Sequence, residues 1–313
     1  MNRNLTRTIT TGLLILVLSL FATAQAPAFK KKTTTDKPTT TASAAKTDSQ
    51  STLPTKAEVE SFLAHMFGYN PNLKWSVGEI EKSEMPGVVR VVIVIGDQNS
   101  QLLVMPGGQF AIAGQYDTIP FGADPFAATR KKLDAGTRGP YRGTENPAIT
   151  IVEFSDLQCP FCKQSQPVID RLILEVPEAR LVFQNFPLET IHKWAMKAAK
   201  YDDCVAQQSQ AAFWKFVQGV YEFQSEINET NADEKLKQIA AASGADGDKT
   251  AVCASGPNAF VNVSRSIEFG KSLGINSTPT VFINGRKILN VRDTPFEQLK
   301  TIAEYETSQA KKK

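Results

Sequence analysis

The stretch Ala148-Ile-Thr-Ile-Val-Glu-Phe-Ser-Asp-Leu-Gln-Cys-Pro-Phe-Cys162 contains the signals that decide the fold. Its first half is apolar and rich in β-branched residues, which favours a buried strand over residues 148–154. A helical spacing of apolar residues follows and continues to Val176. Pro160 suits the first position of a helix, because the N–H that it lacks would have no partner there. The sequence therefore predicts a strand, a short loop and a helix that begins at the cysteine pair.

The two cysteines of this stretch, Cys159 and Cys162, have the spacing of a reversible redox centre. Cys159 would lie at the helix N-terminus, where unpaired N–H groups and the helix dipole stabilise negative charge. Since the thiolate is the reactive form of cysteine, this position favours Cys159 as the nucleophile. Cys162, one turn further along, could then attack a mixed disulfide and release the bound partner.

Two other interpretations of the pair stay open at this point. A zinc site needs four ligands, and only Cys204, Cys253 and two histidines are left in the chain to supply them. A purely structural disulfide between the two cysteines of the motif is the second alternative, although the strand–loop–helix context argues against it. We expect neither a metal nor another cofactor.

The motif resembles the thioredoxin superfamily, and more closely its secreted DsbA-like branch, over about residues 147–308. Glu153 lies six residues before the first cysteine, where the family keeps a buried acid. Pro167 lies five residues after the second cysteine, like the proline in the active-site helix of thioredoxin. Thr278-Pro279 precedes an expected strand, at the place of the family's cis-proline, and Asn284-Gly285 predicts a tight hairpin turn after it.

The resemblance implies an α/β protein with a thioredoxin fold over residues 147–310. The span from about residue 190 to 272 has helical patterns and no strand pattern. In the DsbA-like branch, a helical domain interrupts the thioredoxin core at this place, so we expect a helical insertion here.

The resemblance also implies roles for single residues. Cys159 and Cys162 are the catalytic pair, and Glu153 takes the proton of Cys162 through a water molecule during resolution. A carboxylate with a structural role alone is the alternative for Glu153. If Pro279 is cis, its loop should face Cys159, and the backbone of Thr278 could pair with an extended substrate.

Pro160 and Phe161 complete the expected active-site loop. Strongly oxidising relatives carry a histidine where Phe161 stands, and a phenyl ring can neither carry charge nor donate a hydrogen bond. We therefore expect a less activated thiolate and a less oxidising couple. His192 could lie near the active site and tune the thiolate, or it could be a surface residue at a helix start.

Cys204 and Cys253 fall inside the expected helical insertion. Two spare cysteines in a secreted protein most simply pair, so we predict a structural disulfide between them. The long loop that it closes corresponds to roughly 3–4 kcal/mol in the chain-entropy treatment. Two free thiols, or a second redox pair, are the alternatives.

The N-terminal segment has the form of a secretory signal peptide over residues 1–24. Arg3 and Arg7 precede an apolar run, Leu13 to Phe21, and small residues follow it. An uncleaved anchor is the alternative. Residues 25–53 are rich in Thr, Ala, Lys and Ser, which predicts a disordered linker. The protein is therefore expected in the periplasm or another extracytoplasmic compartment.

Residues 54–121 predict a small α+β domain, followed by a connector over residues 122–146. Thr55-Lys-Ala-Glu58 has the form of a capping box before a helix, and short alternating strands follow. His65 is expected on the exposed side of that helix. The domain loosely resembles the dimerisation domain of the DsbC/DsbG isomerases, which would give a homodimer through residues 54–121.

Charge argues against a nucleic-acid partner. The 313 residues carry a formal net charge of +3. The excess belongs to residues 1–53 and the three lysines at the end, so the part between them is mildly acidic.

These features predict an exported thiol–disulfide oxidoreductase that introduces disulfides into exported proteins with cysteines. By resemblance, a quinone-linked membrane partner of the DsbB or vitamin-K-epoxide-reductase-like kind would reoxidise it. A dimeric DsbC/DsbG-like isomerase is the first alternative. A peptide-binding chaperone in which the CxxC motif is incidental is the second.

Overall fold

The computed structural model describes residues 53–113 and 118–312. The signal peptide expected at residues 1–24 lies outside the described residues, as does the expected linker up to residue 52. Within the described ranges, no helix is long and apolar enough to cross a membrane.

The first part of the described chain is one helix and an antiparallel meander. Helix α1 (Lys56–Phe67) begins at the expected capping box, in which Thr55 and Glu58 bond each other's backbone N–H groups. Val59, Phe62 and Leu63 on this helix join the apolar core of the sheet. The sheet has the strand order β1 (Trp75–Lys82), β2 (Val89–Ile95), β3 (Gln98–Val104), β4 (Phe110–Ala113) and β5 (Ile119–Pro120). The two-residue β5 extends the meander beyond the strands expected from sequence.

The second sheet has the order β10-β9-β7-β8-β6, with the motif strand β7 (Ile149–Ser155) at its centre. β8 (Ala179–Asn185) pairs with β7 in parallel, whereas β9 (Thr280–Ile283) pairs with it antiparallel. β10 (Arg286–Ile288) and β6 (Tyr141–Gly143) form the two edges. The Asn284-Gly285 turn joins β9 to β10, and both residues have positive φ (51° and 89°), as a two-residue hairpin turn requires.

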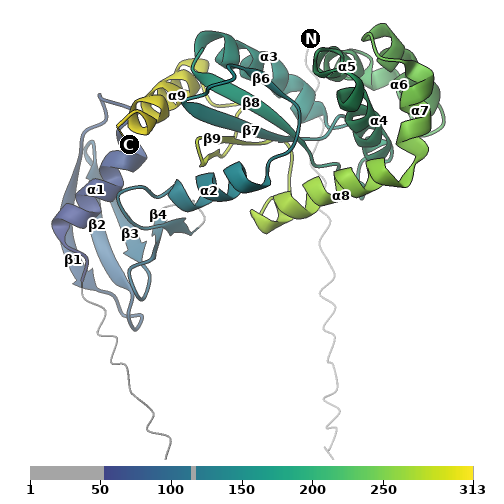
Figure 1. Cartoon of the computed structure of the whole chain (residues 1–313). Helices are drawn as coiled ribbons and strands as arrows, with labels where there is room; N and C mark the ends of the chain where they lie inside the picture. Colours follow the sequence, from purple (N-terminus) through teal and green to yellow (C-terminus); the bar gives the residue numbers. More distant parts are fainter. Residues whose placement is uncertain (1–52, 114–117, 313) are drawn as a thin grey trace, which may run out of the picture. The chain divides into compact units, whose positions relative to one another are not determined.

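Helices cover both faces of this sheet (Figure 1). Ile149 and Ile151 pack with α3 (Pro160–Glu175) and α9 (Phe296–Ala310), whereas Val152 and Phe154 share a core with Leu133 of α2 (Ala127–Gly136). This alternation follows from the period of two along a strand. A thioredoxin fold with its active-site helix on one face is the result.

The segment expected as a connector contributes to the second sheet. β6 lies within residues 122–146, and its three residues pair antiparallel with β8. Its sequence, Tyr-Arg-Gly, is short and polar enough to read as a loop. Only pairing with the edge of β8 makes it a strand.

A helical insertion follows β8, as the sequence predicts. It comprises α4 (Ala195–Gln208), α5 (Gln210–Glu222), the 3-10 turn η1 (Gln224–Glu226), α6 (Ala232–Ala242), α7 (Gly247–Ser255) and α8 (Pro257–Ser272). Its apolar core is continuous with the active site, because Cys159 and Cys162 belong to the same buried cluster as Phe213 and Phe216 of α5. The insertion therefore packs directly against the redox pair.

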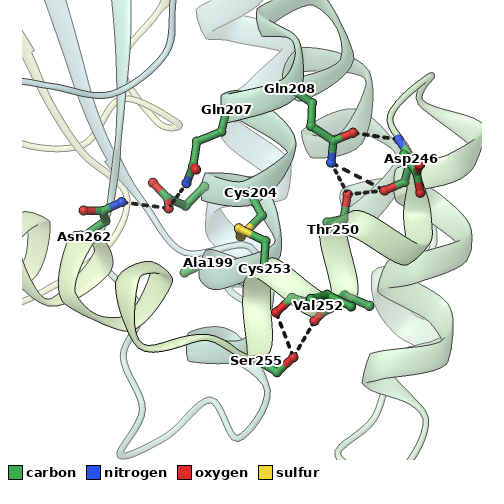
Figure 2. Close-up of a disulfide and its surroundings, with 12 residues drawn as sticks. Ala199, Cys204, Gln207, Gln208, Asp246, Thr250, Val252, Cys253, Ser255 and Asn262 are labelled. Atoms are coloured by element: carbon green, nitrogen blue, oxygen red, sulfur yellow. Dashed lines mark hydrogen bonds between the residues drawn. A yellow bond between two sulfur atoms is a disulfide. The ribbon is translucent and has the colours of Figure 1, made fainter.

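Cys204 of α4 and Cys253 of α7 are joined by a disulfide (Figure 2). The side chain of Gln208 lies beside the bond and ties the same two helices, because its amide contacts the backbone N–H of Asp246 (2.8 Å) and the hydroxyl of Thr250 (2.8 Å). The bond confirms the expected pairing, so in this structure the two cysteines are neither free thiols nor metal ligands.

The expectation that His65 is exposed is wrong. Its side chain is buried, with Nδ1 3.0 Å from the carbonyl oxygen of Ala123 and Nε2 3.7 Å from Oε1 of Glu306. Arg286 of β10 donates to the carbonyl oxygens of His65 (2.7 Å) and Met66 (3.1 Å) and forms an ion pair with Glu306 (3.0 Å). The last turn of α1 thus finds partners for its free carbonyls in residues more than 200 positions away, which no local pattern could indicate.

Candidate active site

Cys159 occupies the N-cap position of α3, and Pro160 is the first residue of the helix. Both Cys159 and Cys162 are free thiols. Cys159 is 3% exposed and Cys162 is fully buried. The outer sulfur is therefore the one that a substrate can reach, and the inner one is placed to resolve.

The two thiols have opposite pKa shifts. Hydrogen bonding from the Cys162 thiol is the largest influence on Cys159 and, with backbone N–H groups at the helix start, lowers the pKa of Cys159 to about 6 against the effect of burial. Burial is the main cause that raises the pKa of Cys162 well above its ordinary value, and the neighbouring Cys159 thiolate adds to it. At neutral pH the pair thus holds one reactive thiolate and one protonated thiol.

Titration of the reduced protein should show this asymmetry directly. The ultraviolet absorbance of the thiolate should rise in a single step with a midpoint near pH 6, and the second thiol should stay protonated until well above pH 9. Cys162→Ala should move the midpoint upward, because it removes the hydrogen bond that lowers the pKa of Cys159 most. Oxidised protein is the control and should show no step. A first midpoint near pH 9 would contradict the assignment.

Glu153 is a fully buried residue of β7, the strand that leads into the motif. Its Oε1 accepts a hydrogen bond from Gln166 Nε2 of α3 (2.7 Å), whereas Oε2 has no hydrogen-bond partner among the described residues. Burial raises the pKa of Glu153 to about 7, against smaller lowering contributions from Ser155, Gln166 and Arg142. A carboxyl with such a pKa can take up or release a proton at neutral pH.

The Thr278–Pro279 peptide bond is cis, and the Cys159 Sγ lies 3.5 Å from the carbonyl oxygen of Thr278. The loop expected from the resemblance therefore faces the outer cysteine. Phe161, between the two cysteines in the sequence, is 50% exposed, and the guanidinium of Arg292 lies over its ring at 4.6 Å from the ring centroid. Phe161 is thus an apolar surface beside the reactive sulfur rather than a hydrogen-bonding group.

His192 lies between β8 and α4, and its side chain contacts Asp156 in the loop that precedes the motif rather than either sulfur. Its Nδ1 lies 2.7 Å from Oδ2 of Asp156, which is buried and also accepts from the backbone N–H of Leu188 (2.8 Å). The backbone N–H of Asp156 in turn donates to the Cys162 Sγ (3.5 Å). His192 is thus connected to the inner cysteine only through Asp156.

Sequence reasoning missed Asp156, Ser155, Tyr221 and Gln224. Asp156 and Ser155 lie in the sequence next to the motif, and that position could have marked them as candidate site residues. Gln224 of η1 donates to the carbonyl oxygens of Leu157 (2.8 Å) and Cys159 (3.2 Å), and Tyr221 of α5 bonds Ser155. No sequence signal distinguished these two, because each lies more than 60 positions from its partner.

The described part of the chain holds no cluster of three or more His, Cys, Asp or Glu side chains that could bind a metal ion. With Cys204 and Cys253 bonded to each other, the zinc alternative also lacks the ligands that it required.

Comparison with solved structures supports the fold. Oxidised BdbD from Bacillus subtilis is 22% identical, with a TM-score of 0.50, over 56% of this chain and 94% of that chain. The transitional conformation of Proteus mirabilis ScsC is 18% identical, with a TM-score of 0.50, over 58% of this chain and 80% of that chain. At these identities the likeness concerns the fold and not the activity.

Curated relatives match only in part. The Na(+)/H(+) antiporter NhaA 3 of Salinispora tropica is 26% identical over 146 residues, which are 47% of this chain and 22% of that protein. NhaA 1 of Mycolicibacterium gilvum is 28% identical over 149 residues, or 47% of this chain and 23% of that protein. The chain thus spans less than a quarter of the length of these relatives.

The sequence profile of the family Thioredoxin_4, described as thioredoxin, matches residues 136–304. This range contains the second sheet and the helical insertion. It also contains the cysteine pair, Glu153 and the cis-proline. Because the match covers more than half of the chain, the chain belongs to this thioredoxin family.

Proposed function

We propose that the protein is a thiol–disulfide oxidoreductase that introduces disulfides into exported proteins through Cys159 and Cys162. The observation that carries the proposal is that the two thiols of the pair differ in protonation state at neutral pH. Cys159 is a thiolate at neutral pH, whereas the buried Cys162 is held as a thiol. The stable thiolate favours the reduced form of the pair, which makes the oxidised form a donor of disulfides.

One turnover of substrate oxidation needs no cofactor, because the oxidised cysteine pair itself accepts the two electrons. A substrate thiolate attacks the Sγ of Cys159 in the oxidised pair, forming a mixed disulfide, and Cys162 leaves with the bonding electrons and takes up a proton. A second substrate thiolate then attacks the substrate sulfur of the mixed disulfide. The substrate leaves oxidised by two electrons, and the enzyme pair is left reduced.

The reduction potential of the pair tests the direction. Equilibration with glutathione buffers, with trapping of free thiols, should give a potential less negative than the roughly −270 mV of thioredoxin and more negative than the roughly −120 mV of DsbA. The exposed phenyl ring of Phe161, which adds no side-chain hydrogen bond to the thiolate, is the reason for an intermediate value. A potential at or below that of thioredoxin would instead assign a reductant.

The compartment and partners form part of the same proposal. The Cys204–Cys253 disulfide supports an oxidising compartment outside the cytosol, such as the periplasm. We propose exported proteins with cysteines as substrates and a quinone-linked membrane protein, of the DsbB or vitamin-K-epoxide-reductase-like kind, as the reoxidant. The pair needs such an oxidant after each turnover.

A homodimer through residues 54–121 would favour a disulfide isomerase over an oxidase. This domain has an apolar core of its own, centred on Val59, Val91 and Leu102. Sedimentation of the whole protein distinguishes the two: a monomer at all concentrations supports the oxidase.

A further inference from the structure

The hydroxyl of Ser155 stands where Glu153, Cys162 and the helical insertion meet. Glu153 and Ser155 are two residues apart on β7, so both point to the face that carries α3. Ser155 is fully buried, and its Oγ lies 2.9 Å from the phenol oxygen of Tyr221, which is also buried. Asp156 directly follows β7, and its backbone N–H donates to the Cys162 Sγ (3.5 Å).

We propose that the Ser155 hydroxyl, oriented by Tyr221, carries the proton between Cys162 and Glu153. The proposal rests on the proposed function, because it concerns the step in which Cys162 enters or leaves the disulfide. It replaces the water molecule expected from the family resemblance with a side chain of this protein, and it assigns the helical insertion a part in the chemistry.

The polar contacts of the three groups fit a relay. Interaction with the Ser155 side chain lowers the pKa of both Glu153 and Cys162, which is expected of a hydroxyl that lies near both groups. Glu153 has one oxygen occupied by Gln166, and Oε2 is left without a hydrogen-bond partner among the described residues. A hydroxyl can accept one proton and donate another by rotating about its C–O bond, which is what a relay to that oxygen requires.

Tyr221 is the positioning residue of this arrangement. Burial is the main cause that raises the pKa of Tyr221 well above its ordinary value, and the charges of Cys162 and Glu153 raise it further. The phenol therefore stays protonated at neutral pH. It can donate steadily to Ser155 Oγ, which leaves the serine proton to point at Glu153 or at Cys162.

Two charged side chains among the described residues shift the pKa of Glu153. Arg142 of β6 lowers its pKa, and Asp170 of α3, which is ion-paired with Arg142, raises it. Because the charges of this ion pair act in opposite directions on Glu153, burial remains the main cause of its pKa of about 7.

The proton transfer balances in both directions. When Cys162 attacks a mixed disulfide, its proton passes to Ser155 Oγ, and the serine proton passes to Oε2 of the Glu153 carboxylate. The Cys162–Cys159 bond then forms, and the departing thiolate takes the electrons of the broken S–S bond. In oxidation of a substrate, the steps run backwards: Glu153 delivers the proton by which the leaving Cys162 thiolate becomes a thiol.

One equivalent of 5,5′-dithiobis(2-nitrobenzoate), added to the reduced protein in a stopped-flow experiment, separates the two steps. Attack by Cys159 releases the first thionitrobenzoate, and attack by Cys162 on the resulting mixed disulfide releases the second. In the unaltered protein, the second rate should rise through pH 7 as Glu153 ionises. Ser155→Ala should slow the second phase by about tenfold or more and remove the step at pH 7. The first phase should be unchanged.

Two further variants complete the test. Tyr221→Phe keeps the ring and removes the phenol oxygen, so it should slow the second phase by a smaller factor and leave the step at pH 7 in place. Ser165→Ala is the matched control. Ser165 is also a buried serine, but it lies on α3, and its hydroxyl donates to the carbonyl oxygen of Phe161 (2.8 Å). This variant should leave both rates as they are.

The outcomes distinguish the relay from the function. If Ser155→Ala shows the second phase at its normal rate and pH dependence, the relay is wrong while the redox activity stands. If the unaltered protein releases only one thionitrobenzoate and forms no Cys159–Cys162 disulfide, the proposed function itself is wrong. An equal slowing by Ser165→Ala would show that loss of packing, and not proton transfer, is the cause.

Discussion

Cys159→Ser should lower the rate of oxidation of a reduced dithiol peptide by on the order of 10³-fold or more, which is the usual effect of removing a catalytic nucleophile. The serine hydroxyl can neither form the reactive disulfide nor become an anion at neutral pH, so no covalent intermediate forms. The measurement is the rate of peptide oxidation by protein that has first been oxidised, with thermal unfolding to verify that the variant is folded.

Cys162→Ser is the matched partner of that variant. It keeps the outer nucleophile and removes the resolving sulfur, so it should trap a mixed disulfide between Cys159 and a substrate. Mass spectrometry of the non-reduced adduct would locate the bond. Peptide oxidation by Cys159→Ser at the rate of the unaltered protein would show that this pair is not the redox centre.

Removal of the second cysteine pair should have the largest effect on stability. The disulfide between Cys204 and Cys253 closes a loop with a sequence separation of 49. The double variant Cys204→Ala/Cys253→Ala should lower the free energy of unfolding by about 4 kcal/mol according to the chain-entropy treatment. Urea denaturation monitored by circular dichroism gives the change, with the midpoint moving to lower urea concentration.

Val252→Ala is the control for this prediction. Val252 precedes Cys253 on α7 and is 74% exposed, so its truncation should change the free energy of unfolding by no more than about 0.5 kcal/mol. The folded double variant should keep the thiolate step of Cys159 near pH 6, because the second pair is not among the groups that shift that pKa. A loss of stability no larger than that of Val252→Ala would show that the bond does not brace the insertion.

Where chemistry and backbone geometry are local, the sequence predicted them. The β-branched run before Cys159, Pro160 at the helix start, the capping box at Thr55 and the Asn284-Gly285 turn each restrict their own few residues to one conformation. These local signals carry the resemblance to the thioredoxin superfamily, and that resemblance implied a thioredoxin fold with a helical insertion. The cysteine pair and its buried acid were recognisable for the same reason, since all three lie within ten residues.

Contacts between distant segments were decided by the tertiary structure alone. His65 has the spacing of a surface residue on an isolated helix, yet Glu306 and Ala123 enclose it. His192 bonds Asp156, and Tyr221 bonds Ser155, across 36 and 66 positions of sequence. Periodicity reports which side of an element is apolar, but not which element will pack there. The partners of a buried polar group depend on that packing, so only the folded chain determined what surrounds Cys162 and which groups can hold its proton.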